Sequence, residues 1–111
     1  RNGFPHSGNR ILIVGMTEEK NPEWMLTSLE ADQSQLVICT QAESPRAMPA
    51  EKLAQAASSL VENVITCPDP RQALKRAFEF AGDEDVILGT GSMYVVGALR
   101  EAYESYKEEQ K

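Results

Sequence analysis

The chain has 111 residues, of which 41% are apolar and 25% charged, which is the composition of one soluble globular domain. No apolar run approaches the roughly 20 residues that cross a bilayer, so we expect no contact with a membrane. The net charge of -6 and the scattered basic residues argue against nucleic acid as a partner. We therefore expect a cytoplasmic protein.

The two ends differ in character from the rest of the chain. Residues 1–9 show no periodicity, and we interpret them as a flexible leader or a cut end. Residues 107–111 form a charged tail. The remaining segment, 10–106, carries the pattern of a folded α/β domain.

Four strand–helix pairs are predicted in chain order, and the first two lie in residues 10–60. Residues 10–15 form an apolar strand, after which Asn21 caps a helix that has Pro22 at its first position. The second strand spans 36–40, and its helix runs from about residue 49 to residue 60. The apolar face of the first helix consists of Trp24, Met25, Leu26 and Leu29.

The third and fourth pairs repeat this design. A short strand over 63–66 precedes a helix that Asp69 caps, with Pro70 first and Gly82 at the end. The fourth strand, 86–89, continues through a small-residue turn into a last helix that Ser92 can cap. The alternation predicts a three-layer αβα, Rossmann-like fold with a parallel sheet of about four strands and flanking helices.

Three strand-to-helix loops carry chemistry, and right-handed crossovers place them on one edge of the sheet. Lys20 stands in the first loop, and Ser44 and Arg46 in the second. In the third loop, Gly91 and Ser92 allow a ligand to approach backbone N–H groups. The planar guanidinium of arginine suits a carboxylate or a phosphate, and lysine adds a point charge.

An ordinary wet surface remains the alternative for these loops. Arg46 would then pair with Glu43 or Glu51, and Lys20 with Glu18. Each loop taken alone slightly favours that interpretation. The three loops taken together favour a ligand site.

The sequence lacks the residues that a metal site, a catalytic triad or a nucleotide-binding loop would need. Cys39 and Cys67 each end a predicted strand outside any Cys-x-x-Cys pair, so we expect reduced, buried thiols. The single histidine, His6, completes neither a metal site with them nor a Ser-His-Asp set. Residues 89–92 match neither a dinucleotide fingerprint nor a phosphate-binding P-loop.

Three motifs occur in a characteristic order. Residues 15–26 read Gly-Met-Thr-Glu-Glu-Lys-Asn-Pro-Glu-Trp-Met-Leu, residues 44–47 read Ser-Pro-Arg-Ala before Glu-Lys-Leu at 51–53, and residues 90–97 read Thr-Gly-Ser-Met-Tyr-Val-Val-Gly. Together they resemble the C-terminal domain of the folylpolyglutamate synthase/dihydrofolate synthase family of the Mur ligase superfamily. The resemblance covers nearly everything from residue 11 to residue 103.

The resemblance implies a part of an ATP-dependent ligase. Such enzymes join a folate or dihydropteroate carboxylate to L-glutamate through an acyl phosphate. The resemblance also implies which residues of this chain contact the substrate: Lys20, Ser44, Arg46, Gly91 and Ser92. It implies no catalytic, cofactor-binding or metal-binding residue in this chain. ATP and Mg²⁺ are implied for the full-length enzyme, bound mainly by an N-terminal P-loop domain, so the chain alone is not expected to catalyse.

The match has two departures. The family's Asp-Lys-Asp is here Glu19-Lys20-Asn21, and the family's first strand and helix have no counterpart before residue 10. A second interpretation is a non-catalytic Rossmann-like module that binds an anionic metabolite or a partner protein. A third is a scaffold piece that dimerises through an unpaired sheet edge.

Overall fold

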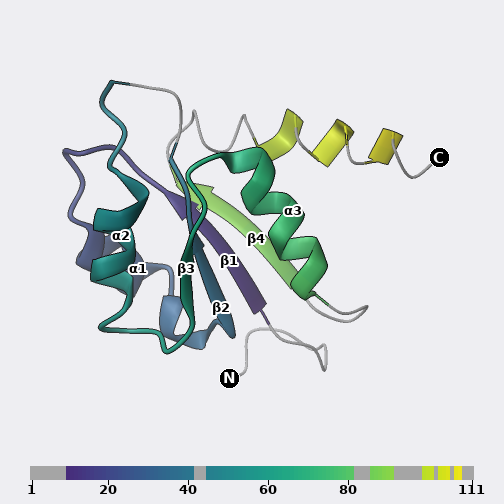
Figure 1. Cartoon of the computed structure of the whole chain (residues 1–111). Helices are drawn as coiled ribbons and strands as arrows, with labels where there is room; N and C mark the ends of the chain where they lie inside the picture. Colours follow the sequence, from purple (N-terminus) through teal and green to yellow (C-terminus); the bar gives the residue numbers. More distant parts are fainter. Residues whose placement is uncertain are drawn as a thin grey trace.

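A single parallel sheet organises the molecule. The computed structural model describes residues 10–41, 45–81, 86–91, 99–101, 103–105 and 107–108. Its strands are β1 (Arg10–Gly15), β2 (Leu36–Cys39), β3 (Val64–Thr66) and β4 (Val86–Gly91), in the order β3-β2-β1-β4 (Figure 1). Every pairing between these strands is parallel, and β1 and β2 are buried along their whole length. The predicted four-stranded parallel sheet is confirmed.

Helices cover both faces of this sheet. The helices α1 (Pro22–Ser28) and α2 (Ala50–Ala57) lie on one face, and α3 (Pro70–Phe80) and the C-terminal helical residues lie on the other (Figure 1). Side chains alternate along β1, so that Leu12 and Val14 belong to one core cluster, and Ile11 and Ile13 to the other. The three-layer αβα arrangement follows directly from this alternation.

Two helix starts agree with the sequence. The Asn21 side chain accepts a hydrogen bond from the backbone N–H of Trp24 at 2.9 Å, and Asp69 accepts one from Arg71 at 3.0 Å. A proline follows each cap at the first helical position, where its missing N–H costs nothing. The third start differs, because Pro49 is the residue that precedes α2 and Ala50 is the first helical residue.

Several boundaries and one side chain depart from the prediction. Helix α2 ends at Ala57 instead of residue 60, and a short 3₁₀ helix, Ala31–Gln33, precedes β2. Strand β4 continues to Gly91, two residues further than predicted. Trp24 is 66% exposed because it lies about 200° around the short α1 from the buried Leu26. The predicted helix end at Gly82, the leader 1–9 and residues 109–111 lie outside the described residues.

Arg10 anchors the amino-terminal edge of the sheet. Its side chain is only 7% exposed, and its Nε donates to the hydroxyl of Ser34 at 3.0 Å. Its Nη2 donates to the backbone carbonyls of Leu29, at 3.0 Å, and of Glu30. Glu30 has a positive φ of 55°, so this buried arginine holds a tight and strained connection between α1 and β2.

Candidate functional site

The carboxyl ends of β1, β2 and β4 meet at one edge. Strand β1 lies between the other two, and its register pairs Val14 with Cys39 on one side and Gly15 with Gly91 on the other. From β1 the chain moves outward to β2 and β3, and then returns to the far side of β1 as β4. This reversal is the topological switch point at which open α/β sheets bind ligands. Two glycines, Gly15 and Gly91, are paired across the switch point.

The first two loops at this edge are bonded to each other. Thr17 and Ala47 form an isolated antiparallel bridge. Beside it, the N–H of Glu18 donates to the carbonyl of Arg46 at 2.8 Å, and the N–H of Met48 donates to the carbonyl of Met16 at 2.9 Å. The loop that carries Lys20 and the loop that carries Arg46 therefore behave as one unit.

Gln41 fastens the base of the second loop. Its side-chain oxygen accepts a hydrogen bond of 2.7 Å from the N–H of Ala50, the first residue of α2. Its backbone N–H donates to the carbonyl of Pro68 at 3.1 Å, and the hydroxyl of the buried Thr40 donates to the same carbonyl at 3.0 Å. The exits of β2 and β3 are thus tied together next to the loop of Arg46.

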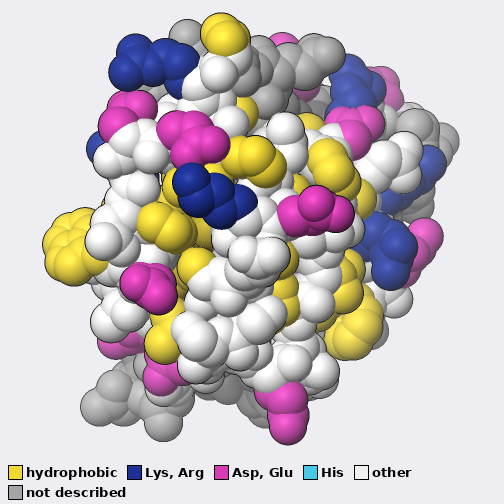
Figure 2. Space-filling view, turned by 60° about the vertical axis from the view of Figure 1, so that its left-hand side comes forward, with side chains coloured by type: hydrophobic (Ala, Val, Ile, Leu, Met, Phe, Trp, Pro, Cys, Tyr) yellow, Lys and Arg dark blue, Asp and Glu magenta, His cyan; other side chains and the backbone are white. Residues whose placement is uncertain are grey.

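Two ion pairs cross between the joined loops and α2. Arg46 Nη2 lies 3.5 Å from Glu19 Oε1, and Lys52 Nζ lies 3.0 Å from Glu18 Oε1. The sequence suggested a pair between Lys20 and Glu18, but Glu18 contacts Lys52 instead. It did not suggest the contact of Arg46 with Glu19, and Glu43, the other acid it offered Arg46 beside Glu51, lies outside the described residues. Figure 2 brings the α1 and α2 side forward and shows basic and acidic side chains next to one another in its upper part.

The structure describes the positions of three of the five predicted site residues. Lys20 and Arg46 are both exposed, on loops that are directly bonded to each other. Gly91 is the last residue of β4 and lies at the same edge, beside Gly15. Ser44 and Ser92 lie outside the described residues. Within the described part of the chain, the Lys20 side chain makes no ion pair.

Sequence reasoning missed two residues of this edge. Glu19 was assigned no role, although it contacts Arg46, and Gln41 was assigned none, although it caps α2. Neither carries a local signal, because each meets its partner only through the pairing of separate loops. A polar residue directly after a buried strand, such as Gln41, was the one available hint.

The described residues do not form a metal centre or present a reactive thiol. They contain no group of three or more histidine, cysteine or acidic side chains that could hold a metal ion. Burial raises the pKa of Cys39 to about 12, and burial also raises the pKa of Cys67. The two thiols are free and pack on opposite faces of the sheet, so both stay protonated at neutral pH.

The chain is similar to a known domain family and to solved enzymes. The profile of the family described as Mur ligase, glutamate ligase domain, matches residues 2–93. Escherichia coli FolC in complex with DHPP and ADP is 25% identical, with a TM-score of 0.80 over 94% of this chain and 24% of that one. A Mycobacterium tuberculosis folylpolyglutamate synthase complexed with ADP and AMPPCP is 27% identical, with a TM-score of 0.76 over 86% and 23%.

A third structure agrees with these two. The bifunctional folylpolyglutamate synthase/dihydrofolate synthase from Yersinia pestis, complexed with AMPPNP and a Mn ion, is 25% identical, with a TM-score of 0.76 over 87% of this chain and 22% of that one. No curated protein sequence matches the chain. The chain spans about a quarter of the length of these solved enzymes. None of the helices formed by the described residues is long and apolar enough to cross a membrane.

Proposed function

We propose that this chain, which belongs to the Mur ligase glutamate ligase domain family, is the amino-acid-binding part of an ATP-dependent ligase. The reaction is the addition of L-glutamate to the carboxylate of a folate or pteroate through an acyl phosphate. The similarity to folylpolyglutamate synthase structures supports the substrate class. The location is proposed to be the cytoplasm.

One observation carries this proposal above the others. The loops of Lys20 and Arg46 are joined by backbone hydrogen bonds next to the switch point of the sheet, where Gly15 pairs with Gly91. Glutamate offers two carboxylates, and this edge offers an arginine fork and a lysine point charge. Arg46 is proposed to bind one carboxylate and Lys20 the other, with Ser44, Gly91 and Ser92 as further contacts.

The chain's own residues bind and orient glutamate in this proposal, and they supply no chemical step. ATP and its metal ion would activate the folate or pteroate carboxylate when they are bound in the full enzyme. The described residues offer no cluster of metal ligands, so both are proposed to be held by a P-loop domain outside this segment. We accordingly expect the isolated chain to release no ADP from ATP, glutamate and dihydropteroate.

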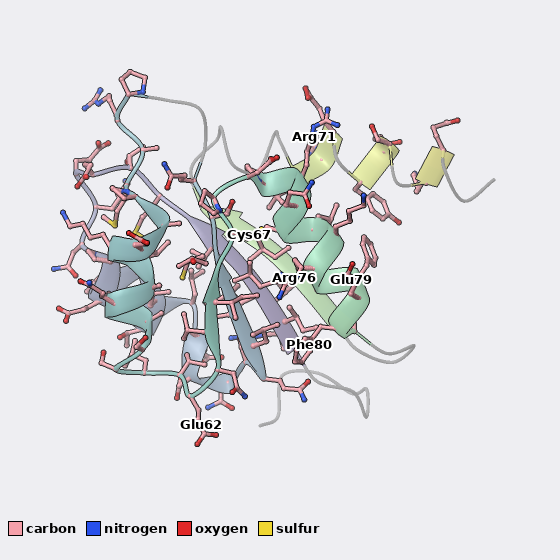
Figure 3. All side chains as sticks on the ribbon, in the orientation of Figure 1. Glu62, Cys67, Arg71, Arg76, Glu79 and Phe80 are labelled. Atoms are coloured by element: carbon pink, nitrogen blue, oxygen red, sulfur yellow. The ribbon has the colours of Figure 1, made fainter. Side chains whose placement is uncertain are left out.

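Titration of the chain with L-glutamate, followed by backbone amide chemical shifts, tests the proposal. We expect the largest shifts at Lys20 and Arg46, and loss of binding in Arg46→Ala. Arg76→Ala is the matched control, because Arg76 is also an exposed arginine in an ion pair, with Glu79 at 3.9 Å. Figure 3 shows Arg76 and Glu79 on α3, on the other side of the sheet from α1 and α2.

The outcome separates the proposal from its main alternative. Equal binding of glutamate and of unrelated anions favours a module for an anionic metabolite instead. Shifts confined to α3, or equal loss of binding in the Arg76 and Arg46 variants, contradict the glutamate site. A concentration-dependent mass in light scattering favours a dimer formed through a sheet edge, in place of a partner domain.

A further inference from the structure

The guanidinium of Arg46 already has a carboxylate partner within the chain. Glu19 comes from the loop after β1 and reaches Arg46 on the loop after β2, with 3.5 Å between Oε1 and Nη2. The two loops are held together beneath this pair by the Thr17–Ala47 bridge and by the hydrogen bond from Glu18 N–H to the Arg46 carbonyl. The pair is therefore built by the joined backbones and does not depend on a chance meeting of side chains.

The neighbouring acid is engaged elsewhere. Glu18 contacts Lys52 on α2 at 3.0 Å, so the two consecutive acids have different cations as partners. Lys20, the next residue, makes no ion pair with any other described residue. The edge thus holds one cation covered by Glu19, one covered by Glu18 and one that faces solvent.

We propose that Glu19 is an internal competitor for the ligand, a carboxylate that occupies Arg46 until a ligand carboxylate replaces it. The inference rests on the proposed function for the identity of the ligand. A small anion that contacts Arg46 alone gains little, because it exchanges one carboxylate contact for another. A ligand with two carboxylates gains an additional contact at Lys20, which offsets the cost of displacing Glu19, so a dicarboxylate such as glutamate binds where a single anion gains little.

The size of the effect follows from exposure. The side chains of Arg46 and Glu19 are 75% and 53% exposed, and ion pairs of this kind are weak. The competition from Glu19 is thus expected to lower the affinity for a dicarboxylate by about threefold. The exchange remains readily reversible for the same reason.

Two isosteric variants test the proposal. Glu19→Gln removes the internal carboxylate, and Glu18→Gln makes the same change in net charge at the adjacent residue. Each variant and the unmodified chain are titrated with L-glutamate and with glutarate, which keeps both carboxylates and lacks the amine. We expect Glu19→Gln to tighten binding of both ligands by about threefold, and Glu18→Gln to change it by less than half of that.

A second readout follows the displaced group itself. In the unmodified chain, labelled with ¹³C at glutamate side-chain carboxyls, the Glu19 signal should move as ligand is added, and the Glu18 signal should stay. Unchanged or weaker binding in Glu19→Gln overturns the inference, as does an equal gain in Glu18→Gln. Both substituted side chains are exposed, so we expect each variant to fold. Thermal unfolding of each variant checks this.

The two ligands separate this inference from the proposed function. If glutarate binds as tightly as glutamate, and both bind more tightly to Glu19→Gln, the glutamate-specific function is contradicted and the inference about Glu19 is supported. Selective binding of glutamate without any gain removes the inference and leaves the function. A chain that binds neither ligand, with or without Glu19, contradicts both.

Discussion

The two edges of the sheet each hold an arginine, and the two arginines are held in opposite ways. At the amino-terminal edge, Arg10 is buried and donates to a hydroxyl and two backbone carbonyls. At the carboxyl-terminal edge, Arg46 is 75% exposed and forms an ion pair with the exposed carboxylate of Glu19. One arginine is part of the fold, and the other is available for exchange.

The comparison shows how the surroundings decide what a cation does. The acceptors around Arg10 are the Ser34 hydroxyl and two backbone carbonyls of the turn before β2, and removing Arg10 would take a hydrogen bond from each of them. Glu19, which contacts Arg46, is an exposed side chain that water or another carboxylate replaces at little cost. Burial therefore makes Arg10 structural, and exposure beside the switch point leaves Arg46 accessible for the ligand contact that we propose.

The largest effect is expected when the buried arginine is removed. Arg10→Met keeps an apolar stem and deletes the donors to Ser34, Leu29 and Glu30, and we expect the free energy of unfolding to fall by about 3 kcal/mol. Urea unfolding monitored by circular dichroism measures this loss. Arg10→Lys keeps the charge and should lose less. A loss below about 1 kcal/mol in Arg10→Met would show that the turn holds itself.

The pH dependence of stability tests whether burial, and not position at the carboxyl-terminal edge, controls the chemistry of a side chain. Cys39 ends β2 at the same edge as Arg46 but is buried, and its pKa is raised to about 12 from an ordinary 9.0. Above pH 9 the unfolded chain loses this proton while the folded chain keeps it. Stability should therefore be full below pH 9 and fall by up to about 1.4 kcal/mol per pH unit towards pH 12.

Substitution of the thiols isolates this contribution. Cys39→Ala should flatten the pH dependence between pH 9 and about 12, when its unfolding curves are compared with those of the unmodified chain. Cys67→Ala should change the slope less, because Cys67 is only partly buried. Equal slopes in the unmodified chain and both variants would mean that neither thiol is shielded from water as the structure has it.

An intermediate effect is expected at Gln41, which supports the exposed arginine from below. Gln41→Ala removes the acceptor for the Ala50 N–H at the start of α2, and a lost helix cap costs about 1 kcal/mol. Gln41→Glu keeps an acceptor and should restore most of that loss. Amide exchange at Ala50 provides the local measurement. Unaltered exchange in Gln41→Ala would show that another group caps the helix.

The smallest effect on stability is expected at Arg46. Arg46→Ala should change the free energy of unfolding by no more than about 0.5 kcal/mol, since an exposed ion pair contributes little. The same variant should lose glutamate binding, as measured by calorimetry. Comparison with Arg10→Met then separates a structural arginine from a ligand-binding one. A loss of stability similar to that of Arg10→Met would remove the distinction.

The sequence by itself determined the elements and the layers. Continuous apolar runs predicted buried parallel strands, and Asn21–Pro22 and Asp69–Pro70 predicted two helix starts that the structure confirms. The order of the loops placed Lys20, Arg46 and Gly91 at one edge. These features follow from local rules, because caps, prolines and apolar periodicity act within a few residues of each other.

Only the tertiary structure decided the partners at that edge. The sequence suggested that Lys20 pairs with Glu18, whereas Glu18 contacts Lys52. It offered Glu43, outside the described residues, or Glu51 as partners of Arg46, and it did not suggest the contact between Arg46 and Glu19. Such pairs depend on the register between β1 and β2 and on the bridge between Thr17 and Ala47. Register is set by packing across the whole sheet, so no local pattern predicts which acid meets which arginine.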